Sequence, residues 1–121
     1  MAKILVVDDS ELARNLIGDV LTKAGHAVRT ASGGGQALDL LGEGAYDLLV
    51  TDWVMPGMMG EELVRKVRER HPKLPVVIIT SYYDSELLTK EEVPGDGVVK
   101  KPFKNETLLG MVDKLVHPPR K

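Results

Sequence analysis

The sequence predicts an α/β fold, a single doubly wound (βα)5 domain built around a parallel sheet. Two observations lead to this prediction. First, four segments are almost wholly apolar: ILVV at 4–7, LLV at 48–50, VVII at 76–79 and VV at 98–99. They are rich in valine and isoleucine and do not alternate with polar residues, which is typical of strands buried on both faces. Second, segments with helical periodicity separate them, so βαβ units with right-handed crossovers are expected.

The other elements follow from the same patterns. The mixed segment HAVRTA at 26–31 indicates a strand at an edge of the sheet. Five helices are expected: one from Ser10 to about Gly25, one around 37–41, one from about Gly60 to Pro72, a weak one at 84–92 and one containing 108–116. The first has apolar residues at helical spacing, namely Leu12, Leu16, Ile17, Val20 and Leu21. The glycine-rich SGGGQ at 32–36 lacks a following Lys-Ser or Lys-Thr pair, so it indicates a turn that opens the second helix and not a phosphate loop.

Length and composition limit the classes of function. The 121 residues suit one domain with one core, and 43% hydrophobic and 28% charged residues are ordinary for a soluble protein. A net charge of −2 does not mark the surface for nucleic acid or for an anionic membrane. The absence of cysteine excludes disulfides and thiolate metal sites. No signal peptide is recognisable and no apolar run approaches the roughly 20 residues that span a bilayer, so a cytoplasmic location is expected.

Polar side chains follow the predicted strands at their carboxyl ends. Asp8 and Asp9 follow the first strand, Asp52 ends the third, Thr80 the fourth and Lys101 the fifth. Taken alone, an acidic pair after a strand is often only a solvated turn. Ligands of open parallel sheets bind beyond the carboxyl ends of the strands, however, so these five residues are expected to meet at one site.

The chemistry of these residues suits phosphoryl transfer. Three carboxylates at one site repel one another unless a cation compensates them. Mg²⁺ fits such a site, because it binds carboxylate oxygens and keeps water positions for phosphate. A lysine and a hydroxyl suit phosphate, and an aspartate can accept a phosphoryl group as a nucleophile. Positioning and charge neutralisation supply most of the catalysis in such reactions.

The chain resembles the receiver domains of two-component response regulators, in particular those of the chemotaxis type. The matching motifs are VVDDS at 6–10, TDWVMPGMMG at 51–60, IITS at 78–81 and KKPF at 100–103. The resemblance implies a flavodoxin-like fold with five parallel strands in the order 2-1-3-4-5. It also implies a receiver domain at residues 1–118, with 119–121 as a tail or the start of a linker.

The resemblance implies a role for each site residue. Asp52 is expected to be the phosphoacceptor. Asp8 and Asp9 are expected to bind Mg²⁺, together with Asp52 and the backbone carbonyl of Val54. Thr80 is expected to donate a hydrogen bond to the phosphoryl group.

The lysine of the site has a neighbour of the same type. The family places its lysine directly before a proline, with which it forms a cis peptide bond. Lys101 precedes Pro102, so Lys101 and not Lys100 is expected to pair with the phosphoryl group. Pro56 and Gly60 are expected to shape the loop after the acceptor.

The resemblance also implies the kind of partner. A sensor histidine kinase or a phosphotransfer protein would donate the phosphoryl group, and a downstream output protein or domain would read the phosphorylated state. A phosphorylation-dependent dimer is compatible with this function. The chain would be a regulatory domain and not an enzyme, although it would catalyse its own phosphorylation and dephosphorylation. No direct binding of nucleic acid or membrane is expected.

Three departures from the family concern the signalling face. Ser81 replaces the small residue, often alanine, that usually follows the threonine, and Lys101 follows Thr80 one position earlier than is common. Val98 stands where the family has its switch aromatic, and valine has no ring to turn. We therefore expect phosphorylation to shift the last strand less than in relatives with an aromatic residue there.

Three alternatives remain open at this point. A pseudo-receiver would bind partners without phosphorylation, but such modules usually lack one of the acids or the lysine. An aspartyl-nucleophile phosphatase of the haloacid dehalogenase type needs a second acid two residues after the nucleophile, where this chain has Val54. A flavin carrier of flavodoxin topology needs loops rich in aromatic and hydroxyl residues and no acidic metal site.

Overall fold

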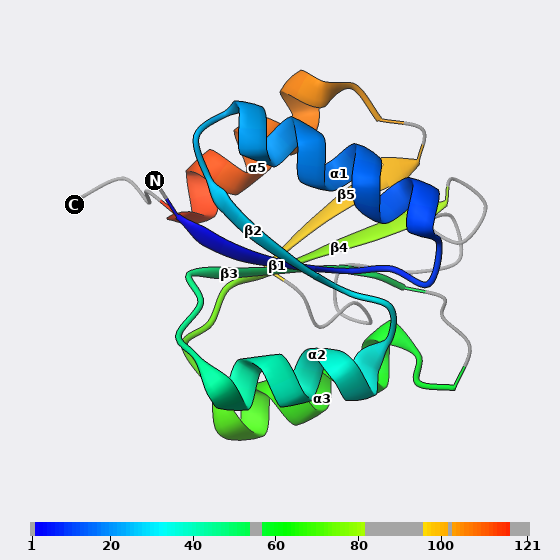
Figure 1. Ribbon diagram of the computed structural model, residues 1–121, viewed down its shortest axis with the longest axis vertical. Helices are drawn as coiled ribbons and strands as arrows, with labels where there is room; N and C mark the ends of the chain where they lie inside the picture. The colour runs from blue at the N-terminus through cyan, green and yellow to red at the C-terminus, as the bar shows by residue number, and fades with distance from the viewer. Residues whose placement is uncertain (1, 54–56, 82–95, 102, 117–121) are drawn as a thin grey trace.

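The fold is a five-stranded parallel sheet between two layers of helices (Figure 1). The computed structural model describes residues 2–53, 57–81, 96–101 and 103–116. Its elements are β1 (Lys3–Val7), α1 (Glu11–Lys23), β2 (Ala27–Ala31), α2 (Gly34–Glu43), β3 (Leu48–Asp52), α3 (Gly60–Arg70), β4 (Val76–Ser81), β5 (Gly97–Lys101) and α5 (Asn105–Val116). The predicted helix at 84–92 and the predictions for Val54, Pro56 and Pro102 lie outside the described residues.

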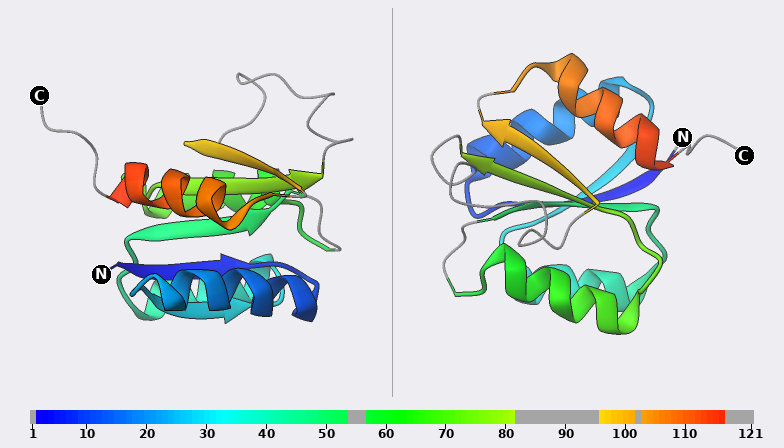
Figure 2. Two further views of the ribbon diagram at one scale, coloured as in Figure 1. Left: turned by 90° about the horizontal axis from the view of Figure 1, so that it is seen from above. Right: turned by 180° about the vertical axis from the view of Figure 1, so that it is seen from behind.

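The strand order is β2-β1-β3-β4-β5, and every described pair is parallel. Both features confirm the expected doubly wound fold. The left view of Figure 2 shows the strands running in one direction, so their carboxyl ends lie at one edge of the sheet. The register pairs Thr51 of β3 with Ile78 of β4, and Ser81 of β4 with Lys101 of β5. The carboxyl ends of these three strands therefore lie at this same edge.

Two apolar cores explain why the strands lack polar alternation. Successive side chains of a strand point to opposite faces of its sheet. In β1, Ile4 and Val6 belong to the core under α1 and α5, whereas Leu5 and Val7 belong to the core over α2 and α3. Figure 1 and the right view of Figure 2 show these helix pairs on opposite faces. Because both faces are covered, the four buried residues of β1, Ile4 to Val7, have to be apolar.

Helix ends lie where the sequence predicts them. Ser10 caps α1, and its Oγ accepts a hydrogen bond from the backbone N of Ala13 at 3.3 Å. The helix is followed by Gly25 at φ 97°, a left-handed conformation that favours glycine. SGGGQ opens α2 as expected, and Gln36 Oε1 accepts a hydrogen bond from the backbone N of Ser32 at 2.9 Å. This local bond orders the turn.

Only some of the apolar residues that recur at helical spacing in α1 are buried. Ile17 and Leu21 are buried, whereas the side chains of Leu12 and Leu16 are 69% and 58% exposed. Leu16 instead lines an open groove of about 530 Å³ between α1 and the start of α5, together with Phe103. A periodic pattern therefore predicts the helix correctly but does not tell which apolar positions reach the sheet.

β2 is an edge strand, as its mixed sequence predicts. It pairs only with β1 among the described strands, and most of its residues are exposed. His26, just before it, has a structural contact: its Nδ1 accepts a hydrogen bond from the backbone N of Ala2 at 3.2 Å. In the part of the chain that the structure describes, no helix is long and apolar enough to cross a membrane.

Candidate functional site

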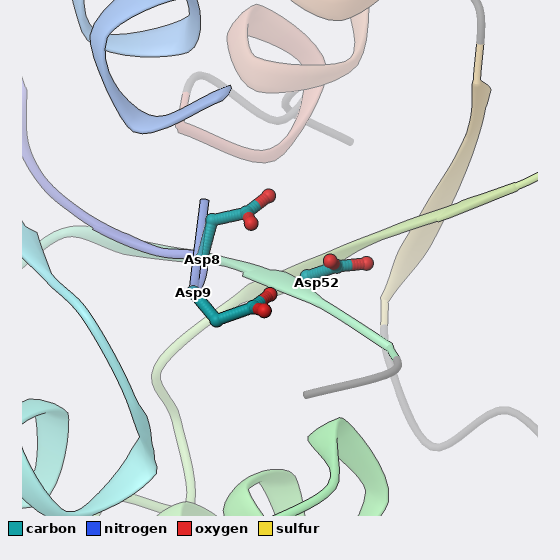
Figure 3. Close-up of side chains that lie close together, drawn as sticks. All are labelled: Asp8, Asp9 and Asp52. Atoms are coloured by element: carbon teal, nitrogen blue, oxygen red, sulfur yellow. The ribbon is translucent and has the colours of Figure 1, made fainter. Parts of the chain in front are cut away.

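Five polar residues meet at the carboxyl edge of the sheet, as the sequence predicts. Asp8 and Asp9 directly follow β1, Asp52 is the last residue of β3, Thr80 lies near the end of β4 and Lys101 ends β5. Figure 3 shows the three carboxyl groups extending to the same side of the strand ends. Residues that are distant in the sequence become neighbours here because parallel strands end at a common edge.

The three carboxylates form a tight group. One oxygen from each of Asp8, Asp9 and Asp52 lies within 4.8 Å of the others. The environments differ, because Asp8 is 1% exposed, Asp52 is partly buried and Asp9 faces solvent. The group thus reaches from the edge of the core to the solvent-exposed side chain of Asp9.

Backbone contacts hold Asp8 in place. Its Oδ1 accepts a hydrogen bond from the backbone N of Ser10 at 2.9 Å, and its own backbone N donates to the carbonyl of Ala31 at 3.2 Å. From the first turns of α1, the Arg14 Nη1 donates to the Asp8 carbonyl at 2.7 Å. Sequence reasoning missed Arg14. The only signal for it was a basic residue one helical turn after the capping Ser10.

Two buried polar atoms at the site have no hydrogen-bond partner among the described residues: Asp8 Oδ2 and Thr80 Oγ1. Leaving a buried polar atom unpaired costs about 1–3 kcal/mol, so such atoms are rare in folded proteins. Asp8 Oδ2 still has an ion-pair contact, because Lys101 Nζ lies 3.5 Å away. Both unpaired atoms lie at the edge where a metal ion and a phosphoryl group are predicted to bind.

Of the two adjacent lysines, Lys101 is the one that lies at the carboxylates. Its Nζ lies 3.5 Å from Asp52 Oδ2 and 3.5 Å from Asp8 Oδ2. Lys100 is exposed. At 3.5 Å both contacts lie at the outer limit of hydrogen-bond length, so they are mainly electrostatic. One lysine therefore faces two carboxylates, and a third, that of Asp9, lies close by.

The electrostatic balance raises the pKa of Asp52 above its ordinary value of 3.8. Burial of the carboxyl group is the largest cause, and the neighbouring charge of Asp8 adds to it. Lys101 and the backbone N of Trp53 act in the opposite direction, and the latter donates to Asp52 Oδ1 at 2.8 Å. The ionised form of Asp52 is thus disfavoured in the protein alone, and an added cation would stabilise it.

The residues of this group fit a hard divalent cation. Mg²⁺ prefers oxygen ligands and commonly takes one or two carboxylates while it keeps several waters. The site offers three carboxylates within 4.8 Å of one another, of which Asp8 supplies a buried oxygen without a hydrogen bond. The donor set contains neither sulfur nor imidazole, which argues against zinc.

The loop after Asp52 depends on Gly60. The backbone N of Gly60 donates to the carbonyl of Trp53 at 2.8 Å, which closes the loop between β3 and α3. A Cβ at position 60 would lie 2.5 Å from the Asp52 carbonyl oxygen and 2.9 Å from Trp53 Cα. Only glycine allows this approach, as the sequence motif predicts. The Trp53 side chain is 7% exposed and packs in the core over α2 and α3.

A model of the response regulator receiver domain matches residues 4–113. The chain belongs to this family. The receiver domain is 38% identical over 117 residues to the chemotaxis protein CheY of Pseudomonas aeruginosa, and the match covers 93% of this chain and 94% of that protein. It is 33% identical over 112 residues to the DNA-binding transcriptional regulator NtrC of Klebsiella pneumoniae, of which the match covers 24%.

Solved structures agree with this assignment. TrrA of Thermotoga maritima, determined in complex with Mg²⁺-BeF, has a TM-score of 0.86 at 32% identity, with 95% of this chain and 99% of that chain covered. The chemotaxis response regulator CheY4 of Vibrio cholerae has a TM-score of 0.85 at 35% identity, with 95% and 98% covered. The chain is therefore a receiver domain, a regulatory module found in two-component and chemotaxis systems. This assignment argues against the phosphatase and the flavin carrier.

Proposed function

We propose that this receiver domain is phosphorylated on Asp52 and signals through partners that distinguish the phosphorylated from the unphosphorylated form. The observation that carries the proposal is the group of three carboxylates around Asp52, with an unpaired buried oxygen on Asp8 and Lys101 at 3.5 Å. Three close carboxylates with too little positive charge beside them repel one another and lower the stability of the fold. It is suited to a cation and to the phosphoryl group that the cation accompanies.

Each residue of the site has a role in this proposal. An Asp52 carboxylate oxygen attacks the phosphorus atom of a phosphohistidine, the P–N bond breaks, and the imidazole of the donor leaves with the electron pair and takes up a proton. Asp8, Asp9 and Asp52 would hold Mg²⁺, together with the backbone carbonyl of Val54. When bound, Mg²⁺ would neutralise the charge that develops on the phosphoryl oxygens.

Thr80 and Lys101 would read the product. The Thr80 Oγ1, which has no described hydrogen-bond partner, would donate to a phosphoryl oxygen. Lys101 would exchange its long contact with Asp52 for a charge-assisted contact with the phosphoryl group. Both side chains gain interactions only when the phosphoryl group is present, so phosphorylation stabilises one conformation of β4 and β5 over others.

The partners follow from this chemistry. A sensor histidine kinase or a phosphotransfer protein would supply the phosphohistidine, and an output protein or domain would bind one of the two forms, in some systems a second copy of the domain. The relative TrrA was solved with Mg²⁺-BeF, which supports the use of beryllofluoride as a phosphoryl mimic for this chain. We propose residues 1–118 as the extent of the domain.

One observation favours a second candidate, a pseudo-receiver that binds partners without phosphorylation. Lys101 contacts Asp8 and Asp52 at the same distance and so compensates part of the acidic charge without a metal ion. In a pseudo-receiver this arrangement would be the working state. The two candidates differ in whether Asp52 reacts.

The deciding experiment is intact-mass measurement after incubation with acetyl phosphate or phosphoramidate. We expect the mass of one phosphoryl group to be added in the presence of Mg²⁺ and nothing to be added with a chelator. Asp52→Asn should abolish the gain. The matched control is Asp47→Asn, at the opposite edge of the sheet, which should react like the wild type. Failure of the wild type to react would favour the pseudo-receiver, and labelling of Asp52→Asn at the wild-type rate would overturn the assignment of Asp52.

A further inference from the structure

The sequence of β5 does not by itself fix which residues of the strand face which partners. Residues 96–101 read D-G-V-V-K-K, with two valines and two lysines in tandem. A shift by one residue toward the site would again place a valine in the buried position of Val99 and a lysine in the position of Lys101. Strand register is weakly specified where the apolar pattern fits more than one alignment. The shift would replace Val98, which packs against the core over α2 and α3, by Gly97, so the pattern opposes it through one partly buried side chain only. A further contact is therefore expected to help select the correct lysine.

Asp96 makes the contacts that distinguish the two alignments. Its backbone N donates to the Val76 carbonyl at 2.8 Å, and its Oδ2 accepts from the Val76 backbone N at 2.8 Å. The same carboxylate oxygen accepts from Arg68 Nη2 at 2.7 Å. Arg68 extends from α3 and also donates from Nη1 to the Leu74 carbonyl at 2.9 Å. One carboxylate thus joins the starts of β4 and β5 to the end of α3.

No other residue of the segment can replace Asp96 in these contacts. It is the only residue among 96–101 whose side chain carries an oxygen. After a shift by one residue, the Val76 N–H would lose its carboxylate acceptor and Arg68 would lose its anion. Charge-assisted hydrogen bonds are among the stronger polar contacts, so both losses favour the observed alignment.

The neighbouring Gly97 opposes the same shift. A Cβ at position 97 would meet the sulfur of Met111 on α5, so this flexible side chain would have to move aside. The shift would move Asp96, which has a Cβ, into this position. The contacts of Asp96 and the close fit of Gly97 against Met111 therefore favour the same alignment, in which Ile79 pairs with Val99 and Ser81 with Lys101.

We propose that Asp96 is a positioning residue for phosphoryl recognition: by fixing the register of β5 from its start, it places Lys101, and not Lys100, at Asp52. The inference rests on the proposed function of Asp52. Asp96 belongs to the opposite end of β5 and acts only through the strand. Asp96 determines which of two adjacent lysines lies at Asp52. A contact that only stabilised the fold would not change which lysine lies there.

The test follows the ε-methylene NMR signals of the two lysines during addition of Mg²⁺ and beryllofluoride. Lys100→Arg and Lys101→Arg assign the signals. In the wild type, Lys101 should respond and Lys100 should not. In Asp96→Ala, Lys100 should respond as well, and the ratio of the Lys101 to the Lys100 shift should fall roughly threefold or more. The exposed Asp113 on α5 supplies the control, because Asp113→Ala should keep the wild-type ratio.

Cross-strand nuclear Overhauser effects give a readout that needs no phosphoryl mimic. The wild type should show Ile79 opposite Val99, and Asp96→Ala should add a second set with Ile79 opposite Val98. Asp96→Asn keeps an oxygen for the Val76 N–H and loses only the charge, so it should show the same change more weakly, and it carries the test if Asp96→Ala does not fold.

The outcomes separate the two proposals. A wild type in which no lysine responds to Mg²⁺ and beryllofluoride would contradict the proposed function and leave the register measurement valid. A single set of cross-strand effects and a response of Lys101 alone, in the folded Asp96 variants, would overturn the role of Asp96.

Discussion

The two edges of the sheet are built on opposite principles. At the amino edge, charged groups are paired: Asp96 accepts from Arg68 and from the Val76 N–H, and Asp47 Oδ2 accepts from the backbone N of Lys3 at 2.8 Å. The Lys3 Nζ also lies 4.5 Å from the centre of the Tyr46 ring. At the carboxyl edge, three carboxylates face one lysine, and two buried polar atoms have no described hydrogen-bond partner.

This difference shows where the chain favours stability and where it favours reactivity. The same strands supply both edges, so neither topology nor strand composition explains the contrast. At the amino edge, opposite charges pair and hold the starts of the strands together. At the carboxyl edge, like charges repel one another, which favours the binding of a cation and, with it, of an anion. Sites that bind or react commonly give up local stability in this way.

The largest expected effect tests the packing of the carboxyl edge. Gly60→Ala should lower the free energy of unfolding by about 3 kcal/mol, because the added methyl meets backbone atoms of Asp52 and Trp53 that cannot rotate away. Gly110→Ala in α5 is the matched control: nothing lies within 4 Å of its Cβ position, so it should be neutral or stabilising by up to about 1 kcal/mol. Urea denaturation measures both, and equal effects would refute the close approach.

The second prediction tests whether the carboxyl edge lacks a cation. Mg²⁺ should raise the free energy of unfolding of the wild type, by about 2.7 kcal/mol at 100 times its dissociation constant. Asp8→Asn, which removes the buried charge of the group, should lose most of this gain. Asp47→Asn at the amino edge should keep it. Thermal unfolding across a Mg²⁺ titration is the measurement, and an equal response of the two variants would place the ion elsewhere.

The third prediction compares one substitution at both edges. At neutral pH, Asp52→Asn should raise the free energy of unfolding by on the order of 1 kcal/mol, because it removes a charge that burial and Asp8 disfavour. Asp47→Asn should lower it by about 0.5 kcal/mol, because a neutral acceptor bonds the Lys3 N–H less strongly. Changes of the same sign would contradict the contrast between the edges.

The pH dependence of this gain has a definite sign. Because the pKa of Asp52 in the folded protein lies above its ordinary value of 3.8, the folded protein holds this proton to higher pH than the unfolded chain does. The wild type should therefore lose stability relative to Asp52→Asn as the pH rises from about 3.8 to the raised pKa, and the difference should be constant above it. Denaturation without Mg²⁺ at a series of pH values measures the difference in stability between the two proteins. If the pKa of Asp52 were lowered instead, the wild type would lose stability relative to Asp52→Asn as the pH falls.

The smallest expected effect concerns Trp53, the only tryptophan of the chain. Its backbone N bonds Asp52 Oδ1 while its side chain is buried in the core. Beryllofluoride with Mg²⁺ should change its fluorescence modestly, because the reaction at Asp52 moves the backbone to which the ring is attached. Asp52→Asn, which should not bind the mimic, is the control. A flat titration in protein that demonstrably binds Mg²⁺ would show that the ring does not sense the site.

The sequence alone determined the fold and the composition of the site. Strands buried on both faces have to be apolar throughout, and strands that alternate with helices have to run parallel, so their carboxyl ends share an edge. The sequence therefore places five residues at one site: Asp8, Asp9, Asp52, Thr80 and Lys101. The motif also identified Gly60, although the structure was needed to show the backbone atoms that exclude a side chain there.

Only the tertiary structure decided which contacts hold these residues in place. The bond from Arg14 to the Asp8 carbonyl and the contacts of Asp96 with Arg68 and Val76 link separate elements, and no local pattern marks them. The exposure of Leu12 on α1 was equally hidden, because helical spacing is the same whether or not a neighbouring layer covers the residue. Periodicity reports the local conformation of a chain, whereas burial and charge pairing depend on which distant segments fold against it.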